Sequence, residues 1–453
     1  MIARSDENND QMNFVKDAIE TISSSKLSHE VYCASVIGFD GSIITTSGLP
    51  CVVGSLCSIK SVHGEISTGE VVRIHKKSLD IIPHETKFPV QIGNTVTLLQ
   101  DRQKVEVGPR LLGRVLDGLG NPLDDLPSPN FEKTYPLDGV PVNPFNRNPI
   151  TEILDVGIRN INSLLTIGLG QRVGIMAGSG VGKSVLLSMI TKSTTADVIV
   201  IALIGERGRE VASFTKDILN SHSSEKVVMV AVPADRSPLL RIQGAKRATA
   251  IAEYFRDQGK NVLLIMDSLT RVAHAQRELG LGLGEQPTSR GYPPSVISLL
   301  PNLIERTGTN ISATGTITSI YTVLADGDDM NTDPIVDTAR AILDGHIVLS
   351  REFAQQGVYP AIDVTRSISR LMSDIVDKKD LENAKKLRRL ISKYQENKDL
   401  IMMGGYAQGQ DSDLDMAITA WPSILEFLKQ DYNEAVSFTE AQKSISELVG
   451  HVQ

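Results

Sequence analysis

The segment from Ala177 to Ser184, AGSGVGKS, has the composition and spacing of a phosphate-binding loop. Its glycines permit a tight backbone turn whose N–H groups surround phosphate oxygens. Lys183 would neutralise the β and γ oxygens of a nucleotide, and the Ser184 hydroxyl would ligate Mg²⁺. Ala177 replaces the first glycine of the general pattern, which matters only if that position needs a positive φ. The predicted nucleotide-binding residues of this segment are Gly178, Ser179, Gly180, Val181, Gly182, Lys183, Ser184 and Val185.

The residues flanking this loop predict the elements that would hold it. The run from Arg172 to Met176 is largely apolar and predicts a buried strand, and the run from Val185 to Ile190 predicts an amphipathic helix. Strand, loop and helix form the context that a phosphate-binding loop requires. The alternative is a glycine-rich turn that binds nothing, and the presence of all these parts together disfavours it.

Two carboxylates further along the chain have the positions that nucleotide hydrolysis needs. Asp267 ends the apolar run Val262 to Met266, the context of a Walker B carboxylate that holds Mg²⁺ through its water shell. Glu206 follows the run Val198 to Ile204, and at the carboxyl end of a neighbouring strand it could polarise a water molecule. Glu210 is a local competitor for this role, and spacing alone does not separate the two glutamates.

The composition bounds the class of protein. A chain of 453 residues with 41% hydrophobic and 22% charged residues predicts two or three globular domains. A net charge of -8 and 4% aromatic residues argue against a nucleic-acid-binding surface. The three cysteines lack C-x-x-C spacing and predict neither a disulfide framework nor a zinc site. We expect a soluble protein of the reducing cytosol, because the chain shows no membrane-spanning run and no signal peptide.

Changes in pattern along the chain predict four segments. Residues 1–26 form an amphipathic segment with apolar residues at helical spacing. Residues 27–100 alternate short apolar runs with turn residues and predict a β-barrel, for which we favour an assembly collar over an oligonucleotide-binding role. Residues 101–374 follow with a proline-rich linker and an α/β domain with a mostly parallel sheet. Residues 375–453 predict a helical domain.

Several elements can be predicted individually. Besides the strands already given, strands are expected at Val227 to Val232, Ile317 to Val323 and His346 to Leu349. The longest clear helix is expected at Ile242 to Gln258. Trp421 is expected in the core of a helix from Met416 to Leu428. A basic helical face, either solvated or partner-binding, is expected at Lys385, Lys386, Arg388 and Arg389.

Six segments together resemble the RecA-like ATPase family of rotary ATP synthases and type III secretion ATPases, over residues from about 110 to 372. The segments are Ala177 to Leu187, Leu203 to Val211, Asp235 to Arg241, Met266 to Arg271, Arg290 to Val296 and Leu343 to Arg351. The resemblance implies an α/β RecA-like P-loop NTPase core with an N-terminal β-barrel and a C-terminal helical domain. The flagellar branch of the type III protein export ATPases is the most similar, on Ser237 to Arg241, Gly405 to Gly409 and Asp415 to Pro422.

The resemblance also assigns roles to site residues. It implies that Glu206 is the catalytic glutamate, that Asp267 is the Walker B residue, that Tyr359 stacks on adenine and that Arg370 is the arginine finger. From the residues alone, Tyr359 would be placed in the core and Arg370 in a surface ion pair. Arg366 is an alternative finger four residues earlier. The family's pore-facing loop corresponds to about 280–286, which a plain flexible loop explains equally well.

The implied function is Mg²⁺-dependent ATP hydrolysis by a ring that energises or primes flagellar protein export and releases substrates from chaperones. Since one chain carries both Glu206 and Arg370, identical copies could complete each other's sites, which favours a homohexamer. The implied partners are a regulatory, stator-like protein, export chaperones and an export gate, with a cytoplasmic location peripheral to the inner membrane. A virulence-type secretion ATPase is the alternative, and a ring helicase or a non-catalytic nucleotide-binding subunit is less favoured.

Overall fold

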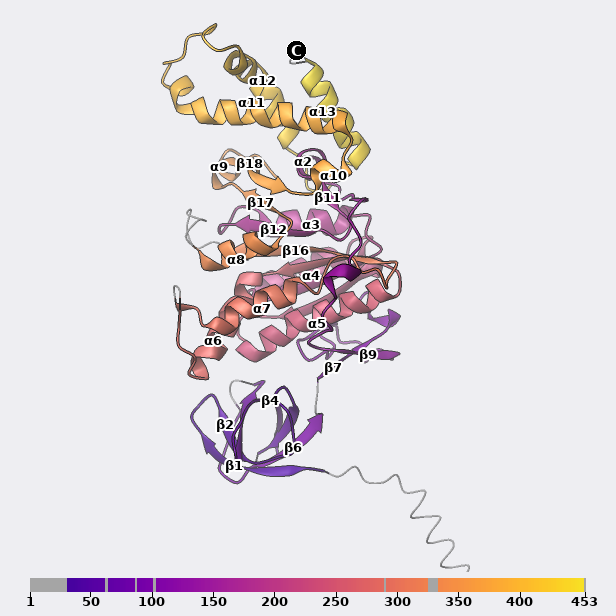
Figure 1. Cartoon of the computed structure of the whole chain (residues 1–453), viewed down its shortest axis with the longest axis vertical. Coiled ribbons are helices and arrows are strands. Elements are labelled where there is room, and N and C mark those ends of the chain that lie inside the picture. The colour runs from indigo at the N-terminus through magenta and orange to yellow at the C-terminus, as the bar shows by residue number, and fades with distance from the viewer. Residues whose placement is uncertain are drawn as a thin grey trace, which may run out of the picture. The chain divides into compact units, whose positions relative to one another are not determined.

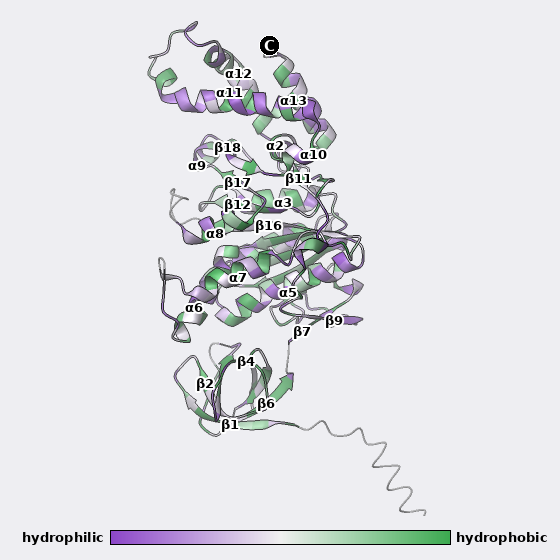
Figure 2. Cartoon of the chain, in the orientation of Figure 1, coloured by the Kyte–Doolittle hydropathy of each residue, from purple (hydrophilic) through white to green (hydrophobic). Residues whose placement is uncertain are grey.

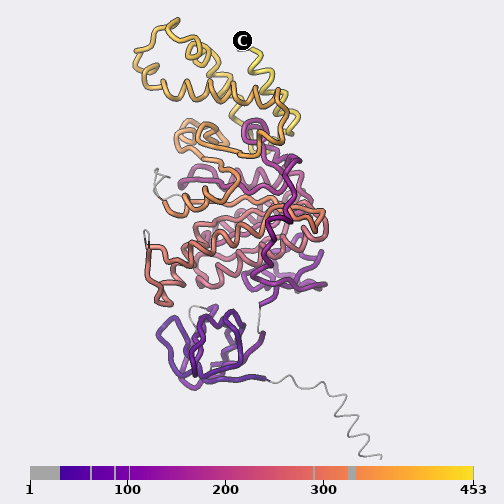
Figure 3. Tube along the Cα trace, in the orientation of Figure 1, coloured from indigo at the N-terminus to yellow at the C-terminus, as the bar shows by residue number. Residues whose placement is uncertain are grey.

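The computed structural model describes residues 31–61, 64–85, 88–100, 103–288, 291–324 and 333–451. The predicted amphipathic segment 1–26 lies outside these residues. The chain divides into two compact units, Met1–Gln103 and Lys104–Gln453, which are described separately (Figure 3). The predicted segment boundaries after residues 26, 100 and 374 stay predictions. Among the described residues, no helix is long and apolar enough to cross a membrane.

The first unit contains a closed six-stranded barrel, as the alternating pattern predicts (Figure 1). Its neighbours pair antiparallel in the order β1-β2-β5-β4-β3-β6. Cys57 lies in the barrel core, where burial raises the pKa of its thiol to about 12, and the three cysteines, which all lie within the described residues, form no disulfide. The strands are β1 (Cys33–Phe39), β2 (Ile44–Ser47), β3 (Leu56–Lys60), β4 (Ile66–Ile74), β5 (Ser78–Pro83) and β6 (Thr95–Gln100).

The second unit is built on an eight-stranded sheet with the order β18-β17-β12-β16-β15-β13-β14-β8. All neighbours in this sheet are parallel except β17 and β18, so the predicted mostly parallel sheet is confirmed. All the predicted strands form within a residue or two of the expected limits. The strands are β8 (Val115–Leu116), β12 (Arg172–Ala177), β13 (Val198–Ile204), β14 (Val227–Val232), β15 (Asn261–Asp267), β16 (Thr316–Leu324), β17 (Gly345–Leu349) and β18 (Ile362–Ser369).

Alternating side chains of this sheet enter two hydrophobic cores, one on each face. In β13, Ile199 and Ile201 belong to one core and Val200 and Ala202 to the other. The first core takes in α2 (Arg159–Leu164), α3 (Lys183–Ser193) and α4 (Gly208–Leu219). The second core takes in α5 (Pro238–Asp257), α6 (Leu269–Gly282), α7 (Pro294–Ile304) and α8 (Pro334–Ile342).

The helix expected at Ile242 to Gln258 begins earlier, at Pro238. The Ser237 hydroxyl caps it by accepting a hydrogen bond from the Leu240 amide at 3.3 Å, and Pro238 suits the first helical position. It is also not the longest helix, because α11 (Lys378–Met402) has 25 residues.

The helices after residue 372 pack on the first core. They are α10 (Met372–Ile375), α11, α12 (Ser412–Leu428) and α13 (Phe438–His451). Hydrophilic residues cover much of α11 (Figure 2), but Arg388 is not on a solvated face, since it donates to the Ser367 carbonyl at 2.6 Å. Trp421 is only partly buried, because its ring stacks on Tyr394 with centroids 3.9 Å apart at the edge of the core.

The predicted proline-rich linker is part of the second unit. Strands β7 (Lys104–Val107) and β9 (Lys133–Pro136) pair in a small sheet, and Tyr135 meets Tyr254 of α5 edge-on. Residues of this segment therefore pack against α5. The remaining elements are η1 (Pro109–Leu111), η2 (Pro144–Asn146), β10 (Ile153–Leu154), β11 (Ile167–Gly168), η3 (Ser224–Lys226) and α9 (Arg351–Gln355).

Candidate active site

The predicted phosphate loop connects the buried strand β12 to the start of α3. Gly180 and Gly182 have positive φ angles of 78° and 90°, which explains why glycine stands at both positions. Ala177 lies within β12 and has no positive φ, so its departure from the general pattern has no cost. Val181 is buried, whereas the side chains of Ser179, Ser184 and Val185 are exposed, and Gly178 is half-buried. The loop therefore offers its backbone and the Ser184 hydroxyl to a ligand.

Lys183 joins both predicted carboxylates. Its Nζ lies 3.2 Å from Glu206 Oε1 and 2.5 Å from Asp267 Oδ1. The lysine and Glu206 side chains are each 12% exposed and Asp267 is 6% exposed, so solvent screens this triad little. The Thr322 hydroxyl on the adjacent strand β16 donates to Asp267 Oδ1 at 2.6 Å and orients that carboxylate. Residues separated in sequence thus meet at the carboxyl ends of β12, β13 and β15.

The charges in this cluster shift the pKa of both Glu206 and Lys183. Burial and the neighbouring Asp267 raise the pKa of Glu206, and they outweigh the opposing effect of Lys183. Burial alone would lower the pKa of Lys183, but the two carboxylates raise it above its ordinary value. The lysine therefore remains a cation at neutral pH, while Glu206 is a stronger base than an exposed glutamate.

The structure distinguishes the two candidate glutamates. Glu210 lies on the first turn of α4 with its side chain 43% exposed, and it pairs with Arg207 at 3.1 Å. Glu206 faces Lys183 from the end of β13. The geometry favours Glu206 because it alone of these two contacts the lysine of the phosphate loop.

Arg271 on α6 is a functional candidate that the sequence reasoning missed. Its side chain packs against Gly205, where an added Cβ would lie 2.7 Å from Arg271 Cβ and where φ is +72°. Its Nε is buried and has no hydrogen-bond partner among the described residues, and its charge acts to lower the pKa of Glu206. A buried guanidinium donor without a partner suits an anionic ligand. The sequence did offer one indication of this role, namely a cation four residues after Asp267, at the start of the following helix.

Tyr359 lies over the phosphate loop and not in the core. Its side chain is 44% exposed. Two of its ring carbons, Cδ1 and Cε1, lie 3.4 Å from the place where a Cβ on Gly182 would stand. The ring therefore offers an exposed aromatic face beside the loop, and its backbone carbonyl accepts a hydrogen bond from the Gln430 amide at 2.9 Å.

The two candidate arginine fingers lie in different surroundings. Arg366 of β18 lines a cavity of about 650 Å³ together with Gly178 and Val181 of the chain's own phosphate loop. Arg370, just after β18, is exposed and donates to the Arg340 carbonyl at 3.2 Å. Among the described residues, Arg370 has no hydrogen bond to the loop, Glu206 or Asp267. The structure thus leaves Arg370 outside the cluster formed by its own chain.

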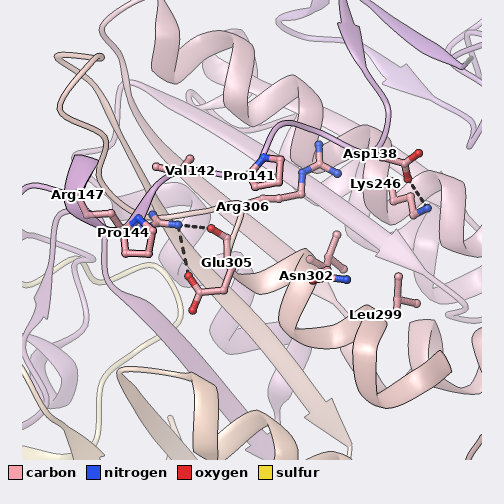
Figure 4. Close-up of a pocket in the computed structure, with 11 residues that line it drawn as sticks. Asp138, Pro141, Val142, Pro144, Arg147, Lys246, Leu299, Asn302, Glu305 and Arg306 are labelled. Carbon is pink, nitrogen blue, oxygen red and sulfur yellow. Dashed lines mark hydrogen bonds and ion pairs between the residues drawn. The ribbon is translucent and has the colours of Figure 1, made fainter. Parts of the chain in front are cut away.

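A second cavity, of about 480 Å³, contains none of the predicted site residues (Figure 4). Its charged side chains largely neutralise one another. Lys246 pairs with Asp138 at 2.6 Å, and Arg147 pairs with Glu305 at 3.4 Å. The phosphate loop therefore remains the centre of the candidate active site.

The fold and this site define a P-loop nucleotide-binding protein of the rotary ATPase type. The family described as "ATP synthase alpha/beta family, nucleotide-binding domain" matches residues 157–369, and "T3SS EscN ATPase C-terminal domain" matches residues 376–447. The flagellum-specific ATP synthase of Salmonella typhimurium is 49% identical over 416 residues, which are 89% of this chain and 91% of that protein. The chain therefore belongs to the family of the flagellum-specific ATP synthases.

Further relatives agree with this family. The flagellum-specific ATP synthase of Pseudomonas aeruginosa is 47% identical over 412 residues, covering 90% of this chain and 91% of that protein. The assembled ATPase EscN from the type III secretion system of enteropathogenic E. coli superposes with a TM-score of 0.86 and 42% identity, over 92% of this chain and 100% of that one. The predicted three-part fold is thereby confirmed.

Proposed function

We propose that this ATPase hydrolyses Mg²⁺-bound ATP with Glu206 as the base that orients water and Lys183 as the cation that meets the phosphates. The contact of Lys183 with both Glu206 and Asp267 carries this proposal. An entering phosphate would compete with the carboxylates for the lysine, and the buried Nε of Arg271 offers a further donor. In this account the loop from Gly178 to Val185 binds the phosphates through its backbone.

The residues at the loop fit Mg²⁺. Ser184 supplies an exposed hydroxyl and Asp267 a carboxylate, which are the hard oxygen donors that this ion prefers. The described residues form no cluster of three or more acidic, His or Cys ligands. Such a cluster is not required, because Mg²⁺ in nucleotide sites is held by one or two protein groups, water and phosphates. When bound, the ion would offset negative charge on the β and γ oxygens.

Two further residues complete the proposed site, one that contacts adenine and one that supplies a cation from a neighbouring copy. Tyr359 would stack on the base, which its exposed ring beside Gly182 supports. Arg370 would act as the finger of a neighbouring copy, since its position outside its own cluster leaves it available to another chain. A chain that carries one half of a site on each of two surfaces makes head-to-tail contacts, which form a ring where the rotation closes, and we propose a homohexamer. The related EscN has been solved in an assembled form.

We further propose that hydrolysis energises flagellar protein export and releases substrates from chaperones. The flagellum-specific relatives support the flagellar branch over a virulence-type system. EscN has been solved in complex with its central stalk EscO, and a regulatory partner of that kind is proposed here. Export chaperones and a gate at the inner membrane are the other proposed partners, with the ring in the cytoplasm and peripheral to that membrane.

The substitution Glu206→Gln tests the catalytic proposal. Steady-state ATP hydrolysis should fall by about 10²- to 10⁴-fold, the range for loss of a general base, while nucleotide binding persists. Glu210→Gln is the matched control, because it makes the same change on an exposed glutamate, and its turnover should stay near that of the parent. Unchanged turnover in Glu206→Gln would show a non-catalytic or differently catalysed site.

The export proposal needs a separate measurement. Expression of the parent chain in a flagellated bacterium that lacks its own export ATPase should restore secretion of flagellar proteins, and the Glu206→Gln chain should not. If the parent chain hydrolyses ATP but does not restore secretion, the flagellar assignment would be contradicted and the catalytic assignment would stand.

A further inference from the structure

Asp217 joins three elements at some distance along the chain from the phosphate loop. Its carboxylate on α4 accepts hydrogen bonds from Ser188 Oγ at 2.5 Å and from Lys192 Nζ at 2.6 Å, both on α3. It also accepts a hydrogen bond from the hydroxyl of Tyr432, which lies between α12 and α13. Burial raises the pKa of Asp217, but these hydrogen bonds outweigh it and hold the pKa below its usual value.

Lys192 closes the cluster. Its Nζ donates to the Tyr432 hydroxyl at 2.6 Å, and it lies 4.3 Å from the centroid of the tyrosine ring. Together with its bond to Asp217, these interactions place the Lys192 cation against a carboxylate, a hydroxyl and an aromatic ring. We call Ser188, Lys192, Asp217 and Tyr432 the helix clasp.

The two helices joined by the clasp begin at or just after the catalytic candidates. Helix α3 begins at Lys183, and α4 begins at Gly208, two residues after Glu206. An α-helix of three turns is stiff, so a bond between the later turns of two helices restricts how far their first turns can separate. The clasp bonds between the later turns of α3 and α4 therefore restrict the 3.2 Å distance between Lys183 Nζ and Glu206 Oε1, in addition to the direct contact of these two side chains.

The segment that carries Tyr432 also touches the other side of the site. The Gln430 amide donates to the Tyr359 carbonyl at 2.9 Å, and the Val436 amide donates to the Gly157 carbonyl at 3.0 Å. The connection between α12 and α13 is thus bonded to the adenine-side tyrosine and to both catalytic helices. A movement of the C-terminal helices would reach α3 and α4 through this segment.

We propose that Asp217 is a positioning residue that holds Lys183 and Glu206 in register, and that Tyr432 makes this register depend on the C-terminal helices. The proposal rests on the hydrolytic roles proposed above. A purely stabilising role is the alternative, since Lys192 is 22% and Asp217 35% exposed and solvent screens such a partly buried ion pair less than a surface pair. The positioning role predicts that opening the clasp lowers turnover by more than any loss of folding explains.

The test compares Asp217→Asn and Tyr432→Phe with the parent in the full-length chain. We expect kcat to fall about tenfold in Asp217→Asn, since small misplacements of catalytic groups are costly, with KM for ATP within about threefold and an unchanged Tm. Tyr432→Phe should lower kcat by about threefold. The double variant should be no slower than Asp217→Asn alone, because both changes open the same clasp.

Tyr406→Phe is the matched control for the tyrosine. Tyr406 also donates its hydroxyl to an aspartate, Asp415 at 2.8 Å, but within the C-terminal helical region, and its hydroxyl has no hydrogen bond to α3 or α4 in the described part of the chain. Its kcat should equal that of the parent. If Asp217→Asn fails to fold, Ser188→Ala removes one clasp bond with a smaller change and should lower kcat in the same direction.

Three outcomes would overturn the proposal: an unchanged kcat in Asp217→Asn, a loss of activity that follows a loss of Tm, or an equal loss in Tyr406→Phe. The proposed hydrolytic site fails by a different result, namely retained turnover in Glu206→Gln. The two ideas can therefore be rejected separately.

Discussion

Charged residues have different surroundings at the centre and at the outer edge of the eight-stranded sheet. At the carboxyl ends of β12, β13 and β15, parallel neighbours bring Lys183, Glu206 and Asp267 into direct contact within one chain. At the edge, the antiparallel strand β18 leaves Arg370 exposed, and among the described residues it hydrogen-bonds to the Arg340 and Asp344 carbonyls alone. One chain thus brings Lys183 together with two carboxylates and presents Arg370 on another surface.

The largest effect is expected at the centre. Lys183→Ala removes the only cation in contact with both carboxylates among the described residues, which should abolish detectable hydrolysis and weaken ATP binding by at least about tenfold. Binding of a fluorescent ATP analogue and steady-state hydrolysis measure the two effects. Lys246→Ala is the control, because its ion pair with Asp138 lies in the second cavity, away from the loop. Unchanged affinity in Lys183→Ala would remove the loop from the site.

The next effect is expected at the edge. Arg370→Ala should lower kcat by about 10³-fold, the smaller end of the range for an arginine finger, with ATP affinity nearly unchanged. Arg366→Ala provides the comparison, since Arg366 lines a cavity at its own loop and should alter nucleotide affinity more than kcat. If the two variants showed the opposite pattern, Arg366 would be the finger and the contrast between centre and edge would fail.

A smaller effect is expected from the aromatic face beside the loop. Tyr359→Ala should weaken ATP binding by roughly ten- to a hundredfold, because base stacking on an aromatic ring contributes about 1–3 kcal/mol. Tyr359→Phe keeps the ring and should bind ATP like the parent. Titration calorimetry with ATP and with inorganic triphosphate checks the assignment, because loss of the ring should not change triphosphate affinity.

The smallest expected effect is a shift in the pH dependence of kcat/KM. Burial and Asp267 raise the pKa of Glu206 above the ordinary 4.5, so a larger fraction of Glu206 is protonated at mildly acidic pH. A protonated glutamate cannot accept a proton from water, so kcat/KM should rise with pH through this raised pKa. The acid limb of the kcat/KM profile should lie above pH 4.5, and it should keep its position in Glu210→Gln. An acid limb at or below the ordinary value would contradict the geometry at the centre.

Most of the sheet and the loop could be predicted because short, largely apolar runs are typical of buried parallel strands, even before their neighbours are known. The site was harder, since spacing does not show which of Glu206 and Glu210 faces a lysine on another strand. Arg271 was missed because the burial of its Nε, and the packing of its side chain against Gly205, depend on how α6 packs against the end of β13. The start of α5 was placed late because the cap at Ser237 comes before the helical periodicity.

The most direct test of the account is to mix Lys183→Ala chains with Arg370→Ala chains. Each variant alone should be inactive, whereas mixed rings should recover hydrolysis, because an Arg370→Ala chain with an intact loop can receive Arg370 from its neighbour. Recovery should depend on the mixing ratio and be greatest near equal amounts. No recovery at any ratio, with mixed assembly shown by differently labelled chains, would contradict catalysis shared between neighbouring copies.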